Sequence, residues 1–125
     1  MCAKNMWGNL GELELIKTPT SILREQGSIL FDATKGVLTG SPNVQPRGDQ
    51  FLIDFDIVAR YLNGYRYTLF TVIHGIKIYP LKLENKVHKI TQSCETEERF
   101  QEVVEQILSS KETREIVRTL ISQSK

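Results

Sequence analysis

The feature that most constrains the fold of this chain is a series of strand-like segments between Phe51 and Leu83, separated by very short connections. The segment from Phe51 to Ala59 alternates apolar and polar residues, which is typical of a strand with one buried face. Asn63-Gly64 follows and is the strongest hairpin signal in the chain, because a type I′ turn requires positive φ at both central positions. His74-Gly75 is a second candidate turn and leads into a further strand expected from Ile76 to Leu83. Connections this short join only antiparallel strands, so the sequence predicts an antiparallel meander.

Helical patterns flank this meander on both sides. Thr18 can cap a helix that begins at Pro19, and Gly36 supplies its stop. A second helix is expected after Thr96, and a break with a third helix is expected near Ser109, where the apolar stripe changes phase. We therefore predict one α+β domain over residues 1–125, in which a helix precedes a meander of about four strands and two C-terminal helices follow it.

Several segments are expected to be irregular. Residues 1–11 are expected to form a mobile terminus. Residues 40–50 contain two prolines and two glycines and cannot form a central strand, so we expect a loop there, or alternatively a ragged edge hairpin. Within that loop, Arg47-Gly48-Asp49 is interpreted as a turn and not as an adhesion motif. The alternation from Glu12 to Ile16 favours a short strand, and Gly27 indicates a kink or a close packing contact inside the first helix.

Composition argues against several classes of function. The chain has 16 basic and 15 acidic residues, so it has no long-range attraction to nucleic acid or to an anionic membrane. Cys2 and Cys94 are the only cysteines, so no disulfide framework holds the fold, and a reducing compartment is expected. Both cysteines are interpreted as unreactive thiols. No apolar run reaches the length of a signal peptide or of a membrane span. We therefore expect a cytoplasmic protein without a membrane partner.

No motif in the chain indicates a specific chemistry, so no catalytic residue, metal or cofactor is predicted. His74 and His88 lie outside any short-spaced cluster of metal ligands. Asp54 and Asp56 share one face of their strand and could bind a divalent cation, but carboxylates that keep a strand face soluble are the simpler interpretation. A magnesium nuclease would combine one of them with Glu84-Asn85-Lys86, and this motif lies one strand too far along, in a loop-like segment.

Nucleic-acid binding is weighed on the last predicted helix. Lys111, Arg114 and Arg118 fall along one side of this helix, away from its apolar stripe. Glu112 and Glu115 are interleaved with them, and mixed charges of this kind usually mark a solvated face. Nucleic acid is therefore the less favoured partner.

The second face of the meander supplies the candidate binding residues. A two-residue turn at Asn63-Gly64 would place Phe55 and Ile57 on the core face, together with Phe70 and Val72. The opposite face would then carry six candidate residues: Tyr65, Tyr67, Leu69, Ile73, Asp54 and Asp56. Tyrosines are favoured at interfaces because they present a large area with few rotatable bonds.

From this face we predict a small non-enzymatic domain, accessory or regulatory, that binds another protein or a second copy of itself in a two-fold dimer. One alternative is that a helix simply covers this face. Another is a small-molecule site between this face and a helix, with the tyrosine hydroxyls and one of the two aspartates as polar anchors.

Overall fold

The computed structural model describes residues 3–125, so Cys2 lies outside the described residues. The 3₁₀ turn η1 (Leu10–Glu12) precedes helix α1 (Pro19–Ala33). The strands are β1 (Leu38–Arg47), β2 (Gln50–Ala59), β3 (Tyr65–Gly75), β4 (Leu81–Asn85) and β5 (Ile90–Cys94), with the 3₁₀ turn η2 (Arg60–Leu62) between β2 and β3. Helices α2 (Glu97–Leu108) and α3 (Lys111–Gln123) complete the chain. The predicted α+β architecture is confirmed, and the meander has five strands.

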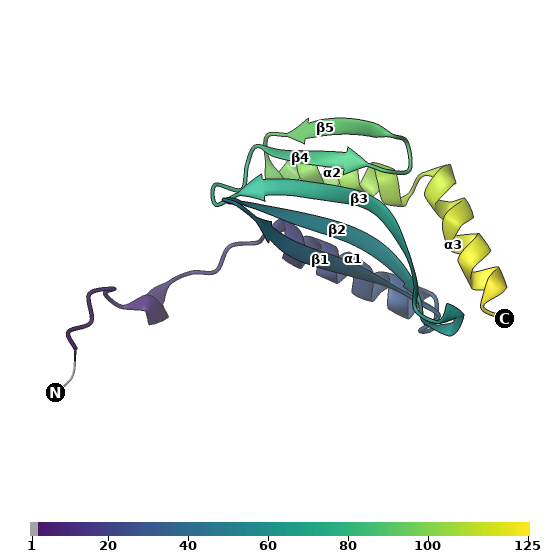
Figure 1. Ribbon diagram of the computed structural model, residues 1–125, viewed down its shortest axis with the longest axis horizontal. Coiled ribbons are helices and arrows are strands. Elements are labelled where there is room, and N and C mark those ends of the chain that lie inside the picture. Colours follow the sequence, from purple (N-terminus) through teal and green to yellow (C-terminus); the bar gives the residue numbers. More distant parts are fainter. Residues whose placement is uncertain (1–2) are drawn as a thin grey trace.

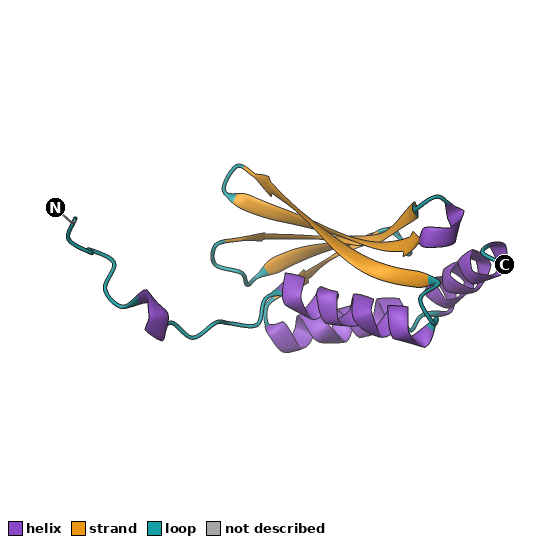
Figure 2. Cartoon of the chain, turned by 90° about the horizontal axis from the view of Figure 1, so that it is seen from below, coloured by secondary structure: helices purple, strands orange, loops and turns teal. Residues whose placement is uncertain are grey.

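The five strands form one antiparallel sheet in the order of the chain, so β1 and β5 are its two free edges. Helices α1 and α2 lie on the same face of this sheet, α1 behind β1 and β2 and α2 behind the strands that follow (Figure 1). The other face carries no helix within residues 3–125, as the view turned by 90° shows (Figure 2). We call this side the uncovered face.

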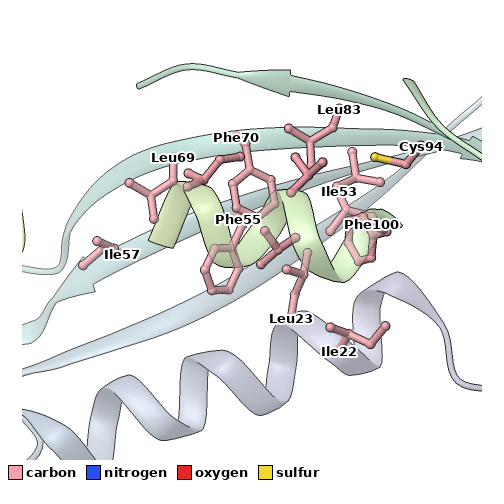
Figure 3. Packing of buried hydrophobic residues seen from close by; sticks show 14 of the residues in the cluster. Ile22, Leu23, Ile53, Phe55, Ile57, Leu69, Phe70, Leu83, Cys94 and Phe100 are labelled. Carbon is pink, nitrogen blue, oxygen red and sulfur yellow. The ribbon is translucent and has the colours of Figure 1, made fainter. Parts of the chain in front are cut away.

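The core fills the space between the sheet and the two helices, where Ile22 and Leu23 of α1 and Phe100 of α2 point toward the strands (Figure 3). Phe55 and Phe70 stack at its centre with ring centroids 5.4 Å apart. Both rings are almost fully buried, which confirms the predicted core face of β2. Burying a ring of this size stabilises the fold by about 1.5 to 3 kcal/mol, so this pair supplies much of the core's cohesion.

Helix α1 begins and ends at the predicted residues. The Thr18 side chain accepts a hydrogen bond from the Ser21 amide, and the Ser21 hydroxyl accepts one from the Thr18 amide, which completes a capping box before Pro19. Gly36 has φ +83° just past the last turn. The C-terminal helices likewise begin at caps on Thr96 and Ser110, so the predicted break is confirmed.

Gly27 marks the place where α1 crosses β1. A Cβ atom built on Gly40 would lie 2.7 Å from the Gly27 Cα atom and 2.7 Å from the Phe55 ring. Real Cβ contacts are never this short, so both positions need glycine and the two backbones touch directly. The close packing contact expected at Gly27 is therefore confirmed.

The loop predicted for residues 40–50 is wrong, because most of this segment is β1, and the alternative of an edge hairpin is the one that forms. Each residue from Leu38 to Arg47 pairs with β2 without interruption. Pro42 and Pro46 lie four residues apart on this edge strand, so both nitrogens point the same way, toward the free edge, where no ladder bond is lost. Gly48 and Asp49 form the turn to β2, with φ +63° at Gly48, so the turn predicted for Arg47-Gly48-Asp49 is confirmed.

Two strand predictions are also wrong. The strand expected from Ile76 to Leu83 begins only at Leu81, after a connection that contains Pro80, and β5 follows as a strand that the sequence did not indicate. The short strand expected over Glu12 to Ile16 does not form, because no sheet edge lies beside that segment (Figure 1).

Candidate functional site

The register of β2 and β3 divides the six candidate residues between two places. Ala59 pairs with Tyr65 and Ile57 with Tyr67, so both tyrosines share the helix-covered side with the core residues of β2. A β-bulge then shifts the register, and Phe55 pairs with Phe70. The extra residue is Leu69, which is buried.

The prediction that the tyrosines share a face with the aspartates is therefore wrong. Its source is the turn: Asn63 and Gly64 have the expected positive φ values of 57° and 70°, but η2 lengthens the connection and changes the register. Ile73, Asp54 and Asp56 lie on the uncovered face, as predicted, because Leu52 pairs with Ile73 and Asp54 with Thr71 beyond the bulge.

Asp56 is the centre of a hydrogen-bonded cluster on the uncovered face. One carboxylate oxygen accepts from the Thr68 hydroxyl at 2.6 Å, and the other accepts from the Asn43 amide at 2.9 Å. The Arg66 guanidinium lies 3.5 Å from the second oxygen. Asp56 is only 5% exposed, so these donors compensate the cost of removing its charge from water. Their occupation of both oxygens favours a structural role for this carboxylate.

Asp54 has a simpler environment, in which one carboxylate oxygen accepts from the Thr71 hydroxyl at 2.6 Å. Thr71 pairs in turn with Glu84, which is in β4 and not in the predicted loop. Asp54 and Glu84 thus lie on the same face with β3 between them, and their backbones are about 10 Å apart by strand spacing. Within residues 3–125, no three His, Cys, Asp or Glu side chains gather as a metal site requires.

Tyr65 and Tyr67 face a groove between the start of β3 and helix α3. The groove has a volume of about 480 Å³. Its lining is mostly apolar and comprises Leu62, Tyr65, Tyr67, Glu115, Ile116, Thr119, Leu120 and Gln123. Tyr65 is 48% exposed, whereas Tyr67 packs against the core. The tyrosines therefore have the helix beside them that the small-molecule interpretation requires, but Asp54 and Asp56 lie on the opposite side of the sheet.

The basic residues of α3 are exposed and partly neutralised. Arg118 pairs with Glu115 at 3.6 Å, and Glu112 lies 3.2 Å from His88 Nε2. A backbone hydrogen bond at the start of α3 and the His88 side chain lower the pKa of Glu112. Lys111 and Arg114 are exposed on the same helix. Glu112 thus remains charged among the basic residues, as a solvated face requires.

Two buried titratable groups lie next to α2. Cys94 is free and buried, and burial raises the pKa of its thiol. The hydroxyl of Tyr79 is buried without a hydrogen-bond partner among the described residues. Burial and, to a smaller extent, the charge of Glu97 raise the pKa of Tyr79 to about 12. Neither group opens onto the uncovered face or the tyrosine groove.

The N-terminal segment, residues 3–18, extends away from the domain (Figures 1 and 2). We call it the arm. Its large apolar side chains are strongly exposed: Met6 85%, Trp7 79%, Leu10 53%, Leu13 66%, Leu15 96% and Ile16 70%. The sequence shows these residues, but only the structure shows that they have no cover, because the expected strand would have placed part of the arm in the sheet.

Comparisons with protein family models, with curated proteins and with solved structures find no match to this chain. No helix within residues 3–125 has the length and apolar character needed to cross a membrane.

Proposed function

We propose that this protein is a small non-enzymatic domain that binds another protein chain, and that the arm is the part that contacts the partner. One observation carries this proposal: six large apolar side chains of the arm are between 53% and 96% exposed. A domain of this size rarely leaves so many large apolar residues together in water, and such groups mark interaction sites.

The energetic reason is the hydrophobic effect. Fully burying one side chain of the size of leucine or methionine stabilises a complex by about 1.5 to 3 kcal/mol before the cost of ordering the chain is subtracted. Trp7 adds the residue type that most often dominates binding energy at interfaces. Several such side chains in one arm are therefore sufficient for a stable contact once a partner provides a matching surface.

The body of the domain also supports the arm, and not the sheet surface, as the part that contacts the partner. Its uncovered face is an antiparallel sheet surface whose central carboxylate is already saturated with hydrogen bonds from Asn43 and Thr68. Antiparallel sheets tolerate water on one face, so this side needs no partner for stability. The balanced charge and the free Cys94 suit a cytoplasmic setting for such a domain.

The groove beside Tyr65 and Tyr67 favours a second candidate function, the binding of a small apolar molecule. Its volume of about 480 Å³ and its mostly apolar lining suit a ligand of that kind. Glu115 and Gln123, at the α3 side, would be its polar anchors.

Photo-crosslinking tests the proposed function. A photoreactive amino acid in place of Leu15, which is 96% exposed, should form a covalent adduct with a protein in cells that produce this chain. The matched control is the same amino acid at Ser28, an exposed position on α1. Adducts at Leu15 that are absent at Ser28 would support the proposal. Equal labelling at both positions, or no protein adduct at Leu15, would contradict it.

A further inference from the structure

We infer that the partner of the arm is a second copy of this chain, and that the segment Leu13 to Lys17 of each copy adds as a sixth strand to the free β5 edge of the other. This inference rests on the proposed function and names its partner and its contact.

The two edges of the sheet differ in how they are protected. On β1, Pro42 and Pro46 remove two amide donors from the free edge, which is a common way to prevent the addition of a further strand. Strand β5 reads Ile90-Thr91-Gln92-Ser93-Cys94 and contains no proline. Its outer amide and carbonyl groups have no neighbouring strand within residues 3–125. The β5 edge is therefore the one that can accept another strand.

The arm contains a segment with the matching property. Leu13 has φ −68° and ψ 132°, an extended conformation, and the structure continues without helix or turn to Thr18. Across the described residues, the backbone groups of Glu14 to Lys17 make no hydrogen bond. If this extended segment lies beside the free edge of β5, the unpaired amide and carbonyl groups of the two strands can form hydrogen bonds with one another.

The side chains of the segment suit this edge. Pairing with Leu13 and Leu15 on the helix-covered side places them beside Ile90, which is 49% exposed at the edge of the sheet. The same pairing places Glu14 and Ile16 on the uncovered face, where β4 contributes the exposed Lys82, and it places Lys17 on the side of the two leucines. The leucines beside Ile90, and Glu14 on the face that carries Lys82, favour this orientation of the segment.

The topology of the domain directs the segment to another copy. Only Thr18 separates Lys17 from the first residue of α1, and α1 is packed on β1 through the contact of Gly27 with Gly40. Helix α2 lies beside α1 and behind the strands nearer to β5 (Figure 1). The segment would have to pass around α2 to reach the β5 edge of its own chain, and a single intervening residue is too short for this. A two-fold exchange lets each copy donate one segment and accept one.

Hydrogen–deuterium exchange on the full chain at low and high protein concentration tests this contact. We expect slower exchange at high concentration in two places, residues 13–17 and β5, and unchanged exchange along β1. Slower exchange along β1, or in the arm without β5, would overturn the inference.

A pair of variants gives the second readout. Leu15→Glu places a charge on the apolar side of the added strand, so the dissociation constant of the dimer should rise by about tenfold or more, measured by light scattering across a concentration series. Ser28→Glu places the same charge on the exposed face of α1, outside the arm, and should leave the constant within about threefold of the parent. Equal effects of the two variants would overturn strand addition.

The outcomes separate this inference from the proposed function. A chain that remains monomeric at all concentrations, yet is crosslinked through position 15 to a different protein, would overturn the second copy as partner and leave the proposed function standing. A dimer that depends on Leu15 but shows no change in β5 exchange would leave protein binding by the arm in place and overturn the β5 contact.

Discussion

At the scale of single residues, the uncovered face depends on how its charges are satisfied. Asp56 is 5% exposed and accepts hydrogen bonds from Thr68 and Asn43, whereas Asp54 is less buried and accepts from Thr71 alone. The alternation of β2 predicted that both carboxylates share this face. It could not predict the burial of Asp56, because that burial arises from the bulge at Phe55/Asp56 and from donors on two other strands.

The two aspartates should therefore differ in their contribution to stability. Asp56→Ala removes the acceptor for two half-buried donors and should lower the free energy of unfolding by about 1 to 3 kcal/mol. Asp54→Ala is the matched control on the same strand face, and we expect it to cost about 1 kcal/mol or less. Urea denaturation of both variants measures the difference. Equal losses would show that the Asp56 cluster is not the stabilising feature of this face.

Tyr79 allows a prediction about pH. An unfolded tyrosine ionises near pH 10, and burial raises the pKa of Tyr79 to about 12 in the folded chain. Between these values the unfolded chain has released this proton and the folded chain has not, so Tyr79 makes stability fall as the pH rises from 10 to 12. Tyr79→Phe should remove that part of the fall.

At neutral pH the same substitution should change the free energy of unfolding by less than about 1 kcal/mol, since the buried hydroxyl has no partner among the described residues. Urea denaturation of parent and variant at pH 7 and pH 11 measures both effects. A large loss at pH 7 would show that the hydroxyl has a partner, and an equal loss of stability by parent and variant between pH 7 and pH 11 would show that the pKa of Tyr79 is not raised.

At the scale of elements, signals that are local in the chain were sufficient for the helices and insufficient for the sheet. The caps at Thr18, Thr96 and Ser110 lie within a few residues of the groups they satisfy, so the sequence predicted all three helix starts. Strand β1 was predicted only as an alternative to a loop, because its prolines are tolerated only on an edge, and the edge position depends on the order of the whole sheet. The register of β2 and β3 was missed because η2 and the bulge leave no local signature.

The contact of α1 with β1 gives a prediction at this scale. Gly27→Ala would push a Cβ atom into the Gly40 backbone, so we expect a loss of about 3 kcal/mol or more, measured by thermal or urea unfolding. Ser28→Ala, at the next and exposed position of α1, is the control and should cost less than about 0.5 kcal/mol. A Gly27→Ala protein as stable as this control would mean that the helix does not lie directly on β1.

At the scale of the whole molecule, the chain consists of a compact body and an exposed arm. Every buried residue of the hydrophobic core lies between Ile22 and Leu120, so the arm contributes nothing to that core. The sequence predicted an irregular terminus and a non-enzymatic binding domain, and it placed the binding surface on the tyrosine-bearing strand. The exposure of the arm could not be predicted, because residues 12–16 have the alternating pattern of a strand that pairs inside its own sheet.

Removal of the arm should therefore leave the body folded. A chain that begins at Lys17 keeps the Thr18 cap and all core residues, and its free energy of unfolding per monomer should stay within about 1 kcal/mol of the full chain under dilute conditions. Urea denaturation at low protein concentration measures this. A loss of several kcal/mol would show that the arm packs on its own domain.

Light scattering on the full chain and on the chain that begins at Lys17, each from micromolar to millimolar concentration, tests most directly whether the arm joins two copies. We predict that the full chain reaches the mass of a dimer, twice 14.3 kDa, whereas the shortened chain stays at the mass of one copy throughout. A full chain that stays monomeric, or a shortened chain that dimerises equally well, would contradict the inference that the arm joins two copies.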